Sequence, residues 1–175
     1  IIAYHEAGHA VVMHLIPEAD PVHKVSIIAR GMAGGYTLSL PEDDRTLYSK
    51  GKFMADLAGL LGGRAAEELV FNDITTGASN DLERATKMAR SMVTRWGMSQ
   101  KLGPMVYGQK EELVFLGREI SEQRDYSESV AQEIDSEVRR LITESYSRAR
   151  TLLTDYREKL DSIARRLMEV ETVDA

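Results

Sequence analysis

Two histidines and a glutamate near the start of the chain have the spacing of a metal site. His5 and His9 stand four residues apart, and Glu6 follows the first of them. In a helix this spacing places both imidazoles on one face, where each can offer a nitrogen to one cation at about 2.0–2.1 Å. Glu6 lies at the edge of that face, too far round to be a good third ligand but able to contact a water on the cation. This is the HExxH pattern of zinc hydrolases, in which the glutamate serves as general base.

A hydrolytic zinc site takes three protein ligands and a water, so a third ligand must come from elsewhere in the chain. The long metzincin motif would need glycine at position 12 and histidine at position 15, where this chain has Val12 and Leu15. A thermolysin-like site would place a glutamate about twenty residues further on, but Ala29 stands there. Glu18 and Asp20 are too close to the predicted helix end to fold back. The third ligand is therefore expected further along the chain.

Two carboxylates remain as candidates. Asp81 falls in the first turn of a helix predicted from about Ala78 to Trp96, within about 40° of its apolar face. A carboxylate on a buried face is costly unless a cation such as a metal pairs with it, although an acid in the first turn also suits the helix dipole. Glu67 falls near the inward face of the preceding helix, where it could form an ion pair or accept the N–H of a ligand histidine. The residues alone favour Asp81 without excluding Glu67.

The composition is that of a soluble globular domain. The chain has 175 residues, of which 43% are hydrophobic and 29% charged, and no apolar run reaches the roughly 20 residues that cross a bilayer. No secretory leader is expected, because the chain opens directly on the motif helix. That helix also has no N-cap residues before it, so we expect a fragment of a longer protein. The absence of cysteine leaves imidazole and carboxylate as the metal ligands. A net charge of −6 without a basic stripe argues against nucleic-acid binding.

Hydrophobic periodicity predicts a mainly α fold with a small β unit, including an edge strand, beside the HExxH helix. The motif helix is expected over 1–16, and β-branched residues predict a strand over 22–28. A short alternating segment follows at 36–41. The next helix, over about 47–70, contains Gly62-Gly63, which indicates either close backbone approach or a kink that divides it into two pieces.

The second half of the chain is predicted to be an irregular connector followed by helices. The connector, at about 98–120, contains several glycines and a possible short hairpin, and the region from about 127 to 170 has the pattern of two helices or one broken helix. We therefore divide a single domain into an active-site lobe at about 1–97, this connector, and a C-terminal helical part at about 121–175.

Five motifs occur in order along most of the chain. They are His5-Glu6-Ala7-Gly8-His9, Asp20-Pro21-Val22-His23-Lys24-Val25, Leu61-Gly62-Gly63-Arg64-Ala65-Ala66-Glu67-Glu68, Thr76-Gly77-Ala78-Ser79-Asn80-Asp81-Leu82 and Leu102-Gly103-Pro104. Together they closely resemble the peptidase domain of the FtsH family of ATP-dependent, membrane-anchored zinc metalloproteases. The resemblance implies that His5, His9 and Asp81 bind Zn²⁺ and that Glu6 is the catalytic base. It also implies that Glu67 is a carboxylate close to the site that supports a ligand.

The resemblance further implies partners that this chain lacks. Family members assemble as homohexamers under a ring of AAA ATPase domains of the same polypeptide, yet no phosphate-binding glycine-rich loop with its lysine is present here. Membrane attachment would come only through segments missing from this chain, with this domain on the cytoplasmic side in bacteria or its equivalent in an organelle. The expected partners are therefore polypeptide substrates, the ATPase module and further copies of the chain, with no nucleic acid.

The segment after the predicted first strand is expected to bind substrate. The resemblance implies that this segment, here Gly35, Tyr36, Thr37 and Leu38, pairs with the backbone of the substrate by strand addition. The chain has Ala29 and Gly34 where members usually carry proline and leucine. We expect this departure to affect substrate affinity and not zinc chemistry.

The function expected from the sequence is zinc-dependent endopeptidase cleavage of unfolded or misfolded polypeptides delivered by an ATPase module. A metal-activated water would be the nucleophile and Glu6 its base. The alternative is a catalytically silent zinc-binding module that holds a ring of subunits together, and the intact Glu6 counts against it. An aminopeptidase is disfavoured because no carboxylate or pocket signature for a free N-terminus is present.

Overall fold

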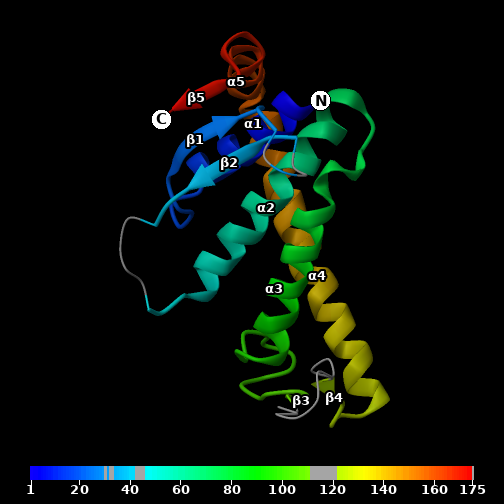
Figure 1. Ribbon diagram of the computed structural model, residues 1–175. Helices are drawn as coiled ribbons and strands as arrows, with labels where there is room; N and C mark the ends of the chain where they lie inside the picture. Colours follow the sequence, from blue (N-terminus) through cyan, green and yellow to red (C-terminus); the bar gives the residue numbers. More distant parts are fainter. Residues whose placement is uncertain (30, 32–33, 42–45, 111–121, 175) are drawn as a thin grey trace.

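The computed structural model describes residues 1–29, 31, 34–41, 46–110 and 122–174 (Figure 1). Its helices are α1 (Ile2–Leu15), α2 (Lys50–Phe71), the 3-10 helix η1 (Thr76–Ala78), α3 (Ser79–Thr94), α4 (Glu128–Asp155) and α5 (Arg157–Val170). Its strands are β1 (Val22–Ser26), β2 (Tyr36–Ser39), β3 (Gln109–Lys110), β4 (Glu122–Gln123) and β5 (Thr172–Asp174). The prediction of a mainly α fold with a small β unit beside the HExxH helix is confirmed.

The β unit is an antiparallel three-stranded sheet in the order β2-β1-β5 that lies against α1 (Figure 1). Val25 in the central strand is paired with Thr37 on one side and with Val173 on the other. The sequence analysis did not predict β5, which follows α5 after Glu171 turns the chain in a left-handed conformation with φ of 63°. Within the described part of the chain, β2 has a strand partner on one side only, so it is the expected edge strand.

Helices α1 and α2 cross with their backbones nearly in contact. A Cβ atom on Gly8 would lie 2.5 Å from the carbonyl oxygen of Gly62, and a Cβ atom on Gly62 would lie 2.8 Å from that of Gly8. Of the two interpretations of Gly62-Gly63, close approach is therefore correct, whereas division into two pieces is wrong. The 22 residues of α2 form one helix because tight packing outweighs the propensity cost of glycine, about 1 kcal/mol per residue.

Helix α2 joins two buried clusters through faces of different character. Small residues, among them Ala55, Ala58 and Ala65, face the cluster that α1 and α5 help to form, while Leu57 and Leu61 face the cluster with α3 and α4. Short side chains on the first face let α1 come close, and leucines fill the wider space on the second. The crossing of α1 on α2 therefore follows from the sequence of α2.

The predicted C-terminal helices are α4 and α5, which meet at Tyr156. The connector turns at Gly97 (φ of 59°) soon after α3 and ends in the antiparallel pair β3–β4, whose second strand falls just beyond residue 120. The remainder of the connector, 111–120, lies outside the described residues. The division of the chain at about residues 97 and 120 stays a prediction. Among the helices described, none combines the length and the apolar character needed to span a membrane.

Candidate metal centre

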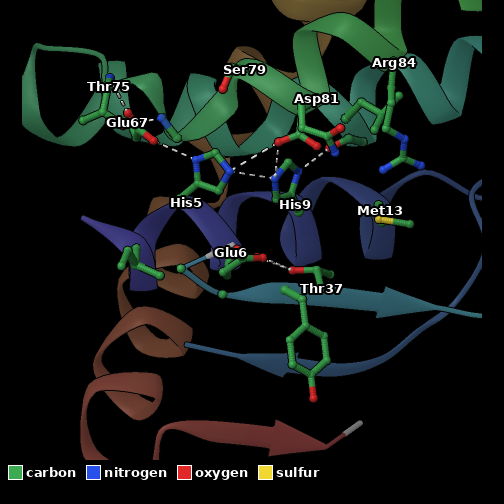
Figure 2. A pocket seen from close by; sticks show the side chains of 18 of the residues that line it. His5, Glu6, His9, Met13, Thr37, Glu67, Thr75, Ser79, Asp81 and Arg84 are labelled. Atoms are coloured by element: carbon green, nitrogen blue, oxygen red, sulfur yellow. Dashed lines mark hydrogen bonds and ion pairs between the residues drawn. The ribbon is translucent and has the colours of Figure 1, made fainter. Parts of the chain in front are cut away.

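His5, His9 and Asp81 converge on one point between α1 and α3 (Figure 2). The Nε2 atoms of the two histidines are 3.0 Å apart. Oδ2 of Asp81 lies 3.4 Å from Nε2 of His5 and 3.3 Å from Nε2 of His9. Tetrahedral coordination with bonds of about 2.0–2.1 Å would separate its ligand atoms by about 3.3–3.4 Å. The three donor atoms thus have nearly the spacing of three corners of a zinc tetrahedron.

The outer nitrogens of both rings are hydrogen-bonded to groups that can only accept. Nδ1 of His5 is 2.7 Å from Oε1 of Glu67, and Nδ1 of His9 is 2.7 Å from the carbonyl oxygen of Gly59. Each Nδ1 is therefore inferred to carry a proton, which leaves the Nε2 lone pair of a neutral ring directed at the shared point. Two lone pairs and a carboxylate oxygen in such proximity require a cation, so these residues fit a bound metal ion.

The electrostatics of the cluster point the same way. Burial opposes ionisation of Asp81, but hydrogen bonds with the His5 and His9 rings outweigh it and hold the pKa of this carboxyl well below its usual range. Burial alone would lower the pKa of His5, yet its hydrogen bonds with Asp81 and Glu67 raise it. Without a metal, a proton is the cation that this cluster attracts. A metal ion at the same point would compete with that proton.

Glu67 supports the site without reaching the point of convergence. Only 1% of its surface is exposed, and its two oxygens accept separate hydrogen bonds, one from His5 and one from the backbone N–H of Thr75 at 2.7 Å. The two carboxylates that competed in the sequence analysis therefore occupy different places. Asp81 lies beside both inner nitrogens, and Glu67 lies behind one ring.

Gly63 makes room for the two imidazoles, a role that the sequence analysis missed. A Cβ atom there would lie 2.5 Å from Nε2 of His5 and 2.6 Å from Nε2 of His9. The backbone of α2 can pass this close only because residue 63 has no side chain. Gly62-Gly63 was the signal, since it indicated a close approach, but the sequence did not show that histidines lie opposite. The contributions of Gly59 and Thr75 come from the backbone and left no signal.

Glu6 points away from the two rings toward β2, on the opposite wall of the same cleft (Figure 2). It is 6% exposed, and Oε2 of its carboxylate accepts a hydrogen bond from the hydroxyl of Thr37 at 2.8 Å. Gly35 is also close, because a Cβ atom on it would lie 2.9 Å from Oε1 of Glu6. The predicted base and the predicted substrate strand are therefore in direct contact.

The cleft that holds these groups has a volume of about 980 Å³. Of the four predicted substrate-binding residues, Gly35, Tyr36 and Thr37 line it, whereas Leu38 does not and is 40% exposed. Because successive side chains of a strand point to opposite faces, the Leu38 side chain points away from the face that carries the Thr37 side chain. Asp20, which the sequence analysis set aside as a ligand, instead forms an ion pair with the buried Lys52 at 3.1 Å.

The two positions that depart from the family pattern lie close to this wall of the cleft. Ala29 is exposed and follows the end of β1, and Gly34 is exposed just before β2. A Cβ atom on Gly34 would lie 2.9 Å from the end of the Ile2 side chain. The effect expected of these two residues on substrate affinity stays a prediction.

Comparison with known proteins finds a matching family model and similar relatives. The model of peptidase family M41 matches residues 1–175. A protein of Thermomicrobium roseum named ATP-dependent zinc metalloprotease FtsH 1 is 61% identical over 172 residues, covering 98% of this chain and 26% of its own length. Proteins named ATP-dependent zinc metalloprotease FtsH are 59% identical over 175 residues in Rubrobacter xylanophilus (100% of this chain, 27% of the relative) and 54% over 175 residues in Thermotoga maritima (99% and 29%).

The chain thus spans between a quarter and a third of the length of these curated relatives. The family match is nonetheless continuous from residue 1 to residue 175, a range that contains the positions of the three converging side chains and of Glu6. A family model matched from the first residue to the last, together with relatives more than half identical, shows that the chain belongs to peptidase family M41.

Proposed function

We propose that this chain is the zinc-dependent endopeptidase domain of an ATP-dependent protease. One observation carries the proposal: three donor atoms lie 3.0–3.4 Å from one another in a cleft that also contains the carboxylate of Glu6. Histidine and carboxylate are ligands that catalytic zinc prefers, and three of them leave a fourth position open. Zinc is further supported by the relatives, which are named zinc metalloproteases.

The residues of this chain have separate tasks in peptide hydrolysis. His5, His9 and Asp81 would hold Zn²⁺. The bound ion would act as a Lewis acid, which would polarise the scissile carbonyl and make a nearby water acidic enough to react near neutral pH. Glu6 takes a proton from the attacking water while the oxygen of that water forms a bond to the carbonyl carbon. Glu6 then gives that proton to the amine as the C–N bond breaks. Glu67 keeps His5 in the orientation that directs Nε2 inward.

The substrate is proposed to be an extended, unfolded polypeptide. Strand β2 is paired with β1 on one side, and three of its residues, with Gly35 before it, line the wall of the cleft that faces the converging groups. An added strand would be held by its backbone, with little regard to its side chains. An ATPase module elsewhere in the full-length protein would unfold and deliver the substrate, with the domain arranged in a homohexamer on a membrane-anchored chain.

Removal of the metal tests this function. In the full-length protein that carries this domain, 1,10-phenanthroline is expected to abolish degradation of unfolded casein, and added Zn²⁺ to restore it, while ATP hydrolysis continues. Casein cleavage is measured from the fragments resolved on a gel, and ATP hydrolysis is measured from the phosphate released. An assembled, zinc-loaded ring that hydrolyses ATP but never cleaves casein would contradict the proposal and support the silent assembly module.

Replacing Glu67 by glutamine is expected to weaken zinc binding about tenfold, within the range known for groups that orient metal ligands. Both Glu67 oxygens accept hydrogen bonds, but glutamine has one acceptor, so its NH₂ group would face either His5 or the Thr75 N–H. Competition with a fluorescent zinc chelator measures the affinity. Glu68→Gln is the matched control, because the Glu68 side chain pairs with Tyr146 and Arg150 instead. Equal affinities for the two variants would contradict the role of Glu67.

A further inference from the structure

We propose that Thr37 is a positioning residue for the base: its hydroxyl holds one oxygen of the Glu6 carboxylate and aligns the base with the strand that receives the substrate. The inference rests on the proposed function. It assigns to Thr37 a side-chain task distinct from the backbone pairing expected of its strand. Its basis is the contact between β2 and α1.

The hydrogen bond from Thr37 goes to the carboxylate in preference to the backbone. Oγ1 of Thr37 is 2.8 Å from Oε2 of Glu6 and 3.1 Å from the main-chain oxygen of the same residue. A hydroxyl has one proton, and the shorter contact to an ionised oxygen is the stronger of the two. Figure 2 shows this contact between the labelled side chains. Across the residues that the structure describes, no other side chain is hydrogen-bonded to this carboxylate.

The two oxygens of Glu6 thereby acquire different tasks. An ionised carboxylate has about four lone-pair sites, and Thr37 occupies one of them on Oε2. Residue 35 has to lack a side chain beside this carboxylate, because a Cβ atom there would lie 2.9 Å from Oε1. With Oε2 held by Thr37, Oε1 is the oxygen left to accept the proton from water.

Thr37 is well suited to link the strand to the base. Its backbone is fixed opposite Val25 in the sheet, and its β-branched side chain has few rotamers. The side chain of Glu6, by contrast, has three rotatable bonds and would lose its only described hydrogen bond from a side chain if the hydroxyl were removed. A substrate that pairs with β2 would thus be aligned with the same strand that fixes the base. This coupling predicts an effect on turnover, whereas a purely substrate-binding residue would affect KM.

The test uses the full-length, zinc-loaded protein and a short, unstructured peptide with an internal fluorophore–quencher pair, so that unfolding is not rate-limiting. Thr37→Val keeps the shape but removes the hydroxyl, and it is expected to lower kcat about 10- to 100-fold, at or below the usual contribution of a general base, with KM changed less than about twofold. Thr37→Ser, which restores the hydroxyl, is expected to recover most of kcat. Zinc content should be unchanged in both variants.

Thr94→Val is the matched control. Thr94 is a buried threonine outside the cleft whose hydroxyl donates to the carbonyl oxygen of Arg90 at 2.8 Å. Loss of this hydroxyl should leave kcat unchanged. If Thr37→Val fails to fold by circular dichroism, Thr37→Ala against Thr37→Ser carries the same comparison.

Two results would overturn the role of Thr37: an unchanged kcat in Thr37→Val, whether or not KM changes, or equal losses of kcat in Thr37→Val and Thr37→Ser. These are distinct from failure of the proposed function. A zinc-loaded wild-type protein that cleaves nothing, or a Glu6→Gln variant as active as the wild type, would overturn both. Cleavage by Thr37→Val at the wild-type kcat, with no cleavage by Glu6→Gln, would overturn the role of Thr37 alone.

Discussion

Replacing Glu6 by glutamine is expected to lower kcat for peptide cleavage by at least about 10²- to 10⁴-fold while leaving the zinc content unchanged. The amide has nearly the same shape as the carboxylate and can still accept the hydrogen bond from Thr37, so α1 and β2 should keep their contact. It cannot take a proton from the attacking water. Because Glu6 points away from the converging nitrogens, its replacement should not disturb them.

The Glu6→Gln measurement separates chemistry from metal binding. Zinc per chain is determined by elemental analysis, and kcat is determined with the quenched peptide on the full-length protein. Glu18→Gln, at an exposed glutamate just beyond the end of α1, is the matched control and should cleave as the wild type does. Cleavage by Glu6→Gln at the rate of the control would show that another group activates the water.

Local periodicity explains why the first part of the site could be predicted from the sequence. The spacing of His5 and His9 fixes their common face as soon as α1 is a helix, and the sequence of α1 predicts that helix. The same reasoning correctly predicted α2 and α3 apart from their end residues. These features depend on neighbours in sequence, so a short window contains the information.

The third converging group could not be placed by such reasoning. Asp81 lies on another helix, and its distance from the histidines depends on how α1, α2 and α3 pack together. Periodicity gave only its angle relative to an apolar face, which Glu67 matched about as well. The distances of 3.3 and 3.4 Å from Asp81 to the two rings now distinguish them, since Glu67 reaches only the outer nitrogen of His5.

Strand β5 illustrates the same limit. Its three residues are too few for an alternating pattern, and it exists because Val173 returns to pair with Val25, far away in sequence. Likewise, Gly62-Gly63 indicated a close approach but not what approaches. The structure places Gly8 against the first glycine and the histidine rings against the second. Contacts between distant segments therefore account for most of what the sequence analysis left open.

Replacing Asp81 by asparagine is expected to weaken zinc binding more than Glu67→Gln does, by more than about 100-fold, because it alters a group at the point of convergence. The neutral amide keeps the shape of the side chain but removes the negative charge that two histidines and a divalent cation require. Cleavage should fall as metal is lost and should recover in part at high zinc concentration. Glu6→Gln should show no such recovery, because its defect is in proton transfer.

The control for Asp81→Asn is Glu83→Gln, an exposed acid two residues further along α3. Both changes remove one negative charge from the same helix turn, so a general effect of charge on metal affinity would appear in both. Only a group that binds the metal should give a large loss in one variant and none in the other. Equal zinc affinities for the two variants would exclude Asp81 as a ligand. Of the cluster seen in the described residues, the two histidines would then remain as ligands, and the third ligand would have to be another group.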